Sequence, residues 1–199
     1  GGRPQKSLIG APGAGDGKAG RAARGCPGPL GGHNWNPVSW NPGTGLLYFS
    51  ELQMPSVFKA DNAVGFKENG RRYNMALDMA GMMDDPAFLA ELRNPRGSLI
   101  AWDVANARIA WQVPQPLPTN GGTLSTAGNL VFHGTADGRL VAYAADSGKQ
   151  LWEGRTFGGV QAGPVSYAVD GRQYIATGIG WGGGHGAAIG GALVDAGRF

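Results

Sequence analysis

Several residue groups in this sequence have the types needed for chemistry but lack the spacing. The stretch 13–19 (GAGDGKA) is similar to a phosphate-binding loop, yet the glycine required five residues before Gly17 is replaced by Pro12. The residue after Lys18, which would ligate Mg²⁺ through a hydroxyl, is Ala19. The stretch therefore does not predict a nucleotide site.

The histidines and the paired acidic residues give no catalytic or metal-binding pattern either. His33, His133 and His185 are far apart and lack a spacing such as His-x-x-x-His, which would bring two ligands to one metal ion. An acidic pair just before Pro86 is interpreted as the start of a short helix over 85–92, because acidic residues and proline favour helix N-termini. Hence we predict no catalytic residue and no metal ligand within this chain.

Glycine is unusually frequent, and the composition as a whole favours an all-β fold. The chain has 199 residues, of which 37 are glycine and 13 are proline, yet 42 % are hydrophobic, 6 are tryptophan and 16 % are charged. A disordered chain has less apolar and more charged content, and glycine costs roughly 1 kcal/mol per helical position relative to alanine. These counts argue against wholesale disorder and against a helical bundle, which leaves a turn-rich, all-β protein.

Charge and cysteine content say little about partners. The net charge is +3, and several of the 17 cationic residues lie near the start, so the rest of the chain is nearly neutral and lacks the basic stripe of a nucleic-acid-binding protein. The sequence has no apolar run of about 18 residues, so it predicts no membrane span. The single cysteine, Cys26, cannot form an internal disulfide.

Strand–turn–strand patterns follow one another beyond residue 33. Residues 38–50 predict a strand, a turn rich in Asn, Pro and Gly, and a second strand. Asp137-Gly138 and Asp170-Gly171 each separate two alternating apolar runs, which is the strongest short-range signal for a β-hairpin. The second half of the chain is therefore predicted to consist of consecutive hairpins.

A repeat organises these hairpins. Ala101 and Trp111 recur 41 residues later as Ala142 and Trp152. Four short strands per unit with a period near 41 residues are typical of a β-propeller blade. Each blade must stack on neighbours because it cannot bury both sheet faces alone. We expect the periodic tryptophan at the end of an outer strand, filling the wedge between two blades.

The tryptophan repeats resemble the docking motif of the quinoprotein alcohol dehydrogenases, in particular their type II, quinohaemoprotein branch. The stretch 142–152 (AYAADSGKQLW) carries the motif, and 101–111 (AWDVANARIAW) is a partly degenerate copy. Three further stretches are similar to segments of that branch: 32–48, 120–132 and 180–184. The resemblance covers about residues 28–185, and departs from the family's usual pattern at Ala144, where the motif has Asp, and at Thr119, where many members have Trp.

The resemblance implies a partial eight-bladed β-propeller with about three to four blades and an incomplete ring. Residues 1–30 would be a low-complexity coil lead-in, and residues 31–199 the C-terminal segment of a propeller that binds pyrroloquinoline quinone (PQQ). The family's catalytic Asp and calcium ligands would then lie in a missing N-terminal part. Haem c would lie in a missing downstream domain, since the chain contains no Cys-x-x-Cys-His.

The function implied by the resemblance is oxidation of small primary alcohols to aldehydes in the periplasm, with PQQ as the hydride acceptor and a cytochrome or haem domain as the electron acceptor. Asn34 and Trp35 match the family's PQQ-contacting pair, whose amide and indole N–H can hydrogen-bond the cofactor's oxygens. Gly184 falls where the family brings its backbone against PQQ, an approach that glycine permits. We expect the chain alone to be inactive.

Alternatives remain open at the level of the protein and of its residues. A cofactor-free propeller scaffold that binds protein partners in the bacterial envelope would carry the same tryptophan repeats, although it has no need to keep Asn34 and Trp35. At those positions, Trp35 could pack between blades and Asn34 could belong to a turn. Gly184 could equally serve an ordinary turn.

Overall fold

The computed structural model of the chain describes residues 23–25, 27, 31–53, 56–58, 86, 96–118 and 120–180. The regular elements of these residues are 12 strands, which fall into two compact units. One unit holds β1 (Ala23–Gly25) and β4 (Ser56–Phe58), which pair antiparallel. Part of the segment expected as coil thus forms a short strand, because it finds a partner strand much further along the chain. The other unit holds the ten remaining strands.

The first four-stranded sheet combines strands from both sides of a long insertion. It consists, in spatial order, of β2 (Ser39–Asn41), β3 (Leu46–Gln53), β5 (Arg96–Asp103) and β6 (Arg108–Gln115), all paired antiparallel. The turn predicted within residues 38–50 joins β2 to β3 and is confirmed. β3 and β5 pair along their full length, although the insertion separates them in the sequence.

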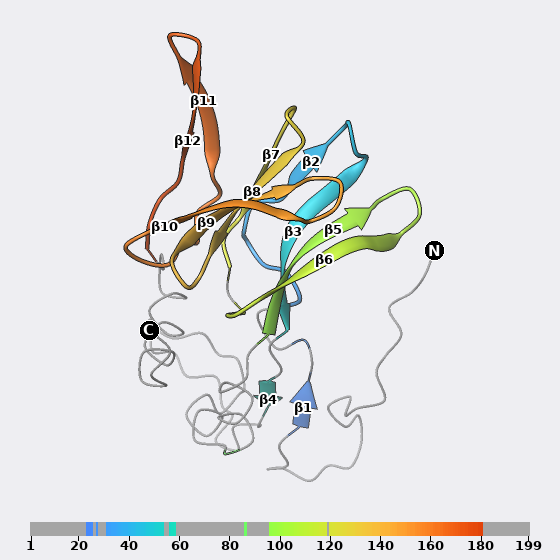
Figure 1. The fold of residues 1–199 in the computed structure, drawn as a ribbon. Coiled ribbons are helices and arrows are strands. Elements are labelled where there is room, and N and C mark those ends of the chain that lie inside the picture. Colours follow the sequence, from blue (N-terminus) through green and yellow to red (C-terminus); the bar gives the residue numbers. More distant parts are fainter. Residues whose placement is uncertain are drawn as a thin grey trace, which may run out of the picture. The chain divides into compact units, whose positions relative to one another are not determined.

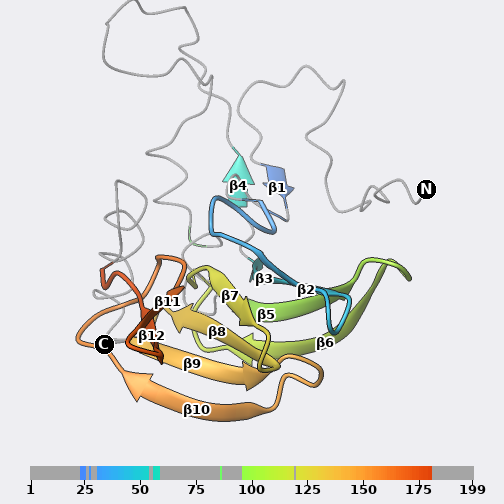
Figure 2. The same ribbon diagram turned by 90° about the horizontal axis from the view of Figure 1, so that it is seen from above.

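The second four-stranded sheet follows chain order without interruption, as Figure 2 shows. Its strands are β7 (Thr123–Thr126), β8 (Leu130–Thr135), β9 (Arg139–Ala144) and β10 (Gln150–Arg155). The hairpin predicted across the Asp137-Gly138 turn joins β8 to β9 and is confirmed. Each strand is therefore held by its sequence neighbours, which is the arrangement of a propeller blade.

A separate hairpin follows the second sheet. β11 (Val165–Val169) and β12 (Arg172–Ala176) pair across the predicted Asp170-Gly171 turn, which confirms that hairpin as well. The hairpin projects away from both four-stranded sheets (Figure 1). The prediction of an all-β chain forming part of a propeller is confirmed, with two complete blades and a further hairpin in the described residues. The helix expected over 85–92 lies, apart from Pro86, outside them.

The main core lies between the two four-stranded sheets. Tyr48 and Leu46 from the first sheet pack with Val131 from the second and with Ala145 beyond it. The Tyr48 side chain is fully buried, and its hydroxyl donates a hydrogen bond of 2.9 Å to the Ala145 carbonyl oxygen. The two sheets therefore share apolar surface and a buried polar contact, as stacked blades must.

Trp111 docks the first blade onto the second, as the repeat predicted. Its Nε1–H donates to the Ala145 carbonyl oxygen at 3.0 Å, and its ring packs against Gly148 in the β9–β10 turn. The equivalent tryptophan of the second blade, Trp152, is 52 % exposed. The two tryptophans at the same repeat position therefore differ. Trp111 is docked against the turn of the next blade, whereas Trp152 is largely exposed in the described residues.

Gly148 is expected to be more sensitive to alanine than other turn glycines. Both Gly148 and Gly171 have a positive φ (70° and 78°), which costs about 1 kcal/mol for alanine. A Cβ at Gly148 would also lie 2.6 Å from the Trp111 ring, whereas a Cβ at Gly171 would meet nothing within 4 Å. We expect Gly148→Ala to lower the free energy of unfolding by about 1–3 kcal/mol more than Gly171→Ala, as measured by urea denaturation. Equal losses would show that the ring does not rest on Gly148.

Candidate functional site

Asn34 and Trp35 lie in the segment that leads into β2, next to the segments that lead into β7 and β11. β2 and β7 are the neighbouring edge strands of the two sheets, joined by a 2.9 Å hydrogen bond from Ser39 Oγ to Thr123 Oγ1. Just before β2, the Pro37 carbonyl oxygen accepts the Thr123 N–H at 2.9 Å. Pro37 also packs against Gly122, before β7, and Gly163, before β11, where an added Cβ would lie 2.7 and 2.9 Å from its ring. The segments that lead into strands of three different sheets therefore meet at Pro37.

The segment 32–37 is held at both of its ends. At the first end, Leu52 N–H donates to the Gly32 carbonyl oxygen at 2.8 Å, and His33 Nδ1 contacts the Ser50 carbonyl oxygen at 2.8 Å. At the other end, Asn36 Nδ2 donates to the Asn120 carbonyl oxygen at 2.9 Å. The first end is fixed to β3 of its own blade and the second to the loop before β7.

Asn34 and Trp35 lie between these fixed ends. The Asn34 Oδ1 accepts the Trp35 backbone N–H at 2.9 Å, a local contact that orients the side-chain amide. Trp35 is 55 % exposed, so the two blades of the described residues leave much of it uncovered. An exposed aromatic ring can stack on the flat face of a planar quinone, and a neighbouring amide can hydrogen-bond its carbonyl and carboxylate oxygens. The side chains of Trp35 and Asn34 are of these two types.

The third candidate residue, Gly184, lies outside the described residues. The described chain ends nearby in sequence at Gly180, whose N–H donates to the Gly159 carbonyl oxygen at 2.7 Å. Gly180 also forms a parallel bridge with Val160, whose N–H donates to the Thr135 carbonyl oxygen at 3.0 Å. The chain after β12 therefore returns to the loop before β11.

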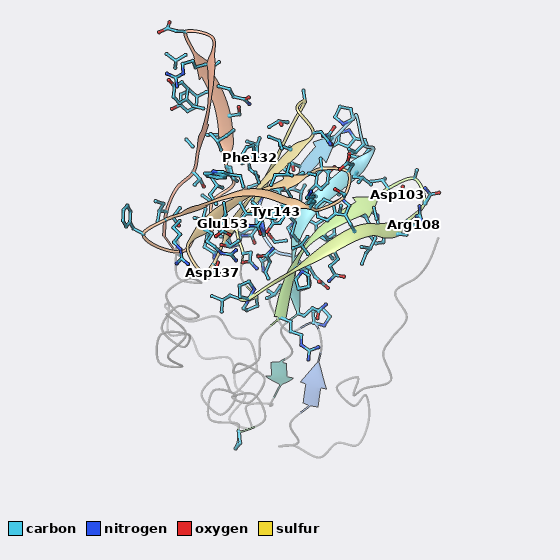
Figure 3. The ribbon with its side chains drawn as sticks, in the orientation of Figure 1. Asp103, Arg108, Phe132, Asp137, Tyr143 and Glu153 are labelled. Atoms are coloured by element: carbon cyan, nitrogen blue, oxygen red, sulfur yellow. The ribbon has the colours of Figure 1, made fainter. Side chains whose placement is uncertain are left out.

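The acidic turn residues hold the turns together. Arg139 binds Asp137 at 2.9 Å and Glu153 at 3.2 Å, and Figure 3 shows these two acidic side chains on the same side of the second blade. Asp146 accepts a 3.1 Å hydrogen bond from Asn129 Nδ2, and this bond is the main cause that lowers the pKa of the Asp146 carboxyl. These contacts agree with the turn predicted at Asp137 and give Asp146 a structural role as well.

A shallow pocket of about 450 Å³ lies at the opposite end of β2, at the turns. Asn41, Thr44, Asn129 and Asp146 supply its polar lining.

Among the residues that the structure describes, no three or more His, Cys, Asp or Glu side chains gather to hold a metal ion. In the same residues, no helix is long and apolar enough to cross a membrane.

Sequence reasoning assigned no role to His133, yet it is fully buried and contacts Ser50, which in turn contacts His33 of the candidate segment. Its Nε2 lies 3.0 Å from the Ser50 Oγ of the first blade. Burial lowers the pKa of His133 from 6.5 to about 4, with the Gly121 backbone carbonyl partly offsetting this effect. The available signal was the alternation along β8, where Val131, His133 and Thr135 share the buried face.

The buried imidazole predicts a loss of stability in mild acid. Between pH 6.5 and 4 the unfolded chain takes up a proton at His133 and the folded chain does not, so stability falls as the pH falls through this window. The shift corresponds to about 3 kcal/mol once pH 4 is reached. We expect His133→Gln to flatten this part of the pH dependence in urea denaturation, whereas the matched control His33→Gln retains it. An unchanged slope in His133→Gln would contradict the assignment.

Comparison with known protein families identifies one match. Residues 18–175 match the PQQ family model described as the β-propeller domain of glucose, ethanol and alcohol dehydrogenases. The quinohemoprotein alcohol dehydrogenase of Comamonas testosteroni is 47 % identical over 164 residues, which cover 81 % of this chain and 23 % of that protein. The quinohemoprotein alcohol dehydrogenase ADH IIB of Pseudomonas putida is 43 % identical over 157 residues, or 79 % of this chain and 22 % of that protein.

Solved structures give the same result for the fold. The Comamonas testosteroni enzyme superposes with a TM-score of 0.70 at 41 % identity, covering 81 % of this chain and 24 % of that one. ADHIIG of Pseudomonas putida superposes with a TM-score of 0.71 at 42 % identity, covering 80 % of this chain and 24 % of that one. A europium-containing methanol dehydrogenase shares the fold, with a TM-score of 0.65 at 23 % identity. The chain spans about a quarter of the length of the quinohemoprotein relatives that it matches.

Proposed function

Because the chain belongs to the PQQ β-propeller family of glucose, ethanol and alcohol dehydrogenases, we propose that it is the C-terminal propeller segment of a quinoprotein alcohol dehydrogenase. The complete protein would oxidise small primary alcohols to aldehydes in the periplasm and pass electrons to a cytochrome or haem domain. The observation that carries the proposal is the braced segment 32–37, which presents Asn34 and an exposed Trp35. The names of the relatives support the reaction class.

In this proposal the chain binds and orients the cofactor. When bound, PQQ would supply the quinone that accepts one hydride, which carries both electrons, from the alcohol carbon, while the hydroxyl proton goes to the base. The Asn34 amide and the Trp35 indole N–H are the hydrogen-bond donors toward its oxygens, and the exposed indole ring covers apolar surface. Gly184 allows the backbone to approach the cofactor closely. The calcium ligands and the catalytic base belong to other parts of the complete protein.

The braces around segment 32–37 limit the orientations that Asn34 and Trp35 can adopt. Bonds to the backbone of Gly32, Ser50 and Asn120 fix both ends of the segment before any ligand arrives. A site organised in advance loses less conformational freedom on binding. The role proposed for this chain is therefore orientation of the cofactor rather than proton transfer.

The test is reconstitution of the complete reading frame that contains this chain. Expressed with PQQ and Ca²⁺, it is expected to show quinone absorbance and to reduce an artificial electron-accepting dye when ethanol or 1-butanol is added. A preparation without PQQ is the control and is expected to be inactive. Absence of both cofactor absorbance and alcohol-dependent dye reduction would overturn the proposal and leave the cofactor-free scaffold.

A further inference from the structure

Ser50 on β3 connects the two loops that hold the candidate cofactor segment. Its backbone carbonyl oxygen contacts His33 Nδ1 at 2.8 Å, and its hydroxyl donates to the Gly121 carbonyl oxygen before β7. The same hydroxyl oxygen lies 3.0 Å from the Nε2 of His133 on β8. Ser50 is buried, so these three contacts replace water completely.

The hydrogen-bond directions at this junction follow from the donor count. The Gly121 carbonyl oxygen can only accept, so it takes the proton of the Ser50 hydroxyl, and it also accepts a hydrogen bond from the His133 ring. Nε2 of His133 must then be the donor to Ser50 Oγ, which fixes the imidazole as the Nε2–H tautomer. Its Nδ1 has no hydrogen-bond partner among the described residues, so this tautomer leaves an acceptor unsatisfied there, whereas the other tautomer would leave a buried N–H unsatisfied. The lowered pKa of His133 agrees with this assignment.

The neighbours of Gly121 hold the far end of segment 32–37. The Asn120 carbonyl oxygen accepts from Asn36, Gly122 packs on Pro37, and the Thr123 N–H donates to the Pro37 carbonyl oxygen. The near end of the segment rests on Ser50 itself through His33. Ser50 therefore contacts the groups that hold both ends of segment 32–37: its backbone bonds His33, and its hydroxyl bonds Gly121. The orientation of this hydroxyl is set by its contact with His133.

We propose that His133 is a positioning residue for the cofactor segment: its Nε2–H orients the Ser50 hydroxyl onto the Gly121 carbonyl and so fixes Asn34 and Trp35 between two blades. That the positioned segment serves a cofactor rests on the proposed function. The contacts of His133, Ser50 and Gly121 do not depend on that function, so they can be tested without cofactor.

The first arm of the test uses amide hydrogen exchange on the full chain. His133→Leu removes the donor at similar volume, and His133→Gln keeps an N–H donor. We expect the leucine variant to exchange about tenfold faster at Leu52 and Thr123, whose amides bond Gly32 and Pro37. The glutamine variant is expected to stay within about threefold of wild type. Exchange in the β11–β12 hairpin is expected not to change.

The second arm introduces the same substitutions into the reconstituted complete protein and measures PQQ binding by quenching of tryptophan fluorescence. We expect about tenfold weaker binding for His133→Leu, recovery for His133→Gln, and no further loss when His133→Leu is added to Ser50→Ala. Unchanged exchange in the leucine variant, equal acceleration throughout the chain, or a glutamine variant as impaired as leucine would overturn the positioning role. If exchange responds as expected while the reconstituted complete wild-type protein binds no PQQ, the positioning role stands and the proposed function fails.

Discussion

Replacing Trp111 by alanine is expected to lower the free energy of unfolding by about 3 kcal/mol, the lower end of the range for large aromatic side chains in cores. The ring lies between the two blades, contacts Tyr48 at a centroid distance of 5.6 Å, and donates to the Ala145 carbonyl oxygen at 3.0 Å. Its removal leaves a cavity, and the Ala145 carbonyl keeps only the Tyr48 hydroxyl as a side-chain donor among the described residues. Urea denaturation of the full chain measures the loss.

Trp152 provides the matched control for this substitution. It occupies the same repeat position 41 residues later, but its ring is 52 % exposed. We expect Trp152→Ala to change the free energy of unfolding by less than about 1 kcal/mol. Similar losses for the two variants would show that the tryptophans act through their own strands rather than by docking neighbouring blades.

Replacing Trp35 by alanine is expected to weaken PQQ binding to the reconstituted protein about 30-fold. The loss combines one hydrogen bond from the indole N–H with the aromatic contact, together about 2 kcal/mol. Trp35→Phe keeps a ring without the donor and is expected to lose about fivefold. Because Trp35 is 55 % exposed, the free energy of unfolding is expected to change little. Titration of PQQ into cofactor-free protein, followed by calorimetry, measures the affinity.

Trp40 tests whether this effect is specific to the proposed site. It lies on β2, close to Trp35 in sequence, and is 49 % exposed. We expect Trp40→Ala to bind PQQ as wild type does. An equal loss in both variants would mean that exposed aromatic surface in general, and not the segment 32–37, governs affinity, and the cofactor role of Trp35 would be withdrawn.

The hairpins could be predicted from the sequence because their signals are local. An Asp-Gly pair between alternating apolar runs specifies a tight turn whose residues tolerate positive φ, and both Gly138 and Gly171 adopt it. The docking of Trp111 could be predicted because the repeat places the same aromatic residue at the same point of each blade. These features need no knowledge of distant segments.

The pairing of β3 with β5 and the contact of His133 with Ser50 could not be predicted in the same way. A long insertion separates the two strands, and no local pattern names their partner. His133 and Ser50 come from different blades and meet only when the blades stack. The candidate site lies between these cases: the family resemblance selected Asn34 and Trp35, while the exposure of the indole and the bonds that brace the segment became apparent only in the structure.

The long separation of β3 from β5 has a consequence for the order of folding. Strands β7 to β10 are joined by short turns, so the second blade can assemble from successive hairpins. Closing a loop as long as the insertion costs about 2 kcal/mol more chain entropy than closing a tight turn. We therefore expect the β2–β3 hairpin to join β5 late, onto a surface that β5 and β6 have already formed. The part of the sheet that comes first in the chain is thus expected to pair last.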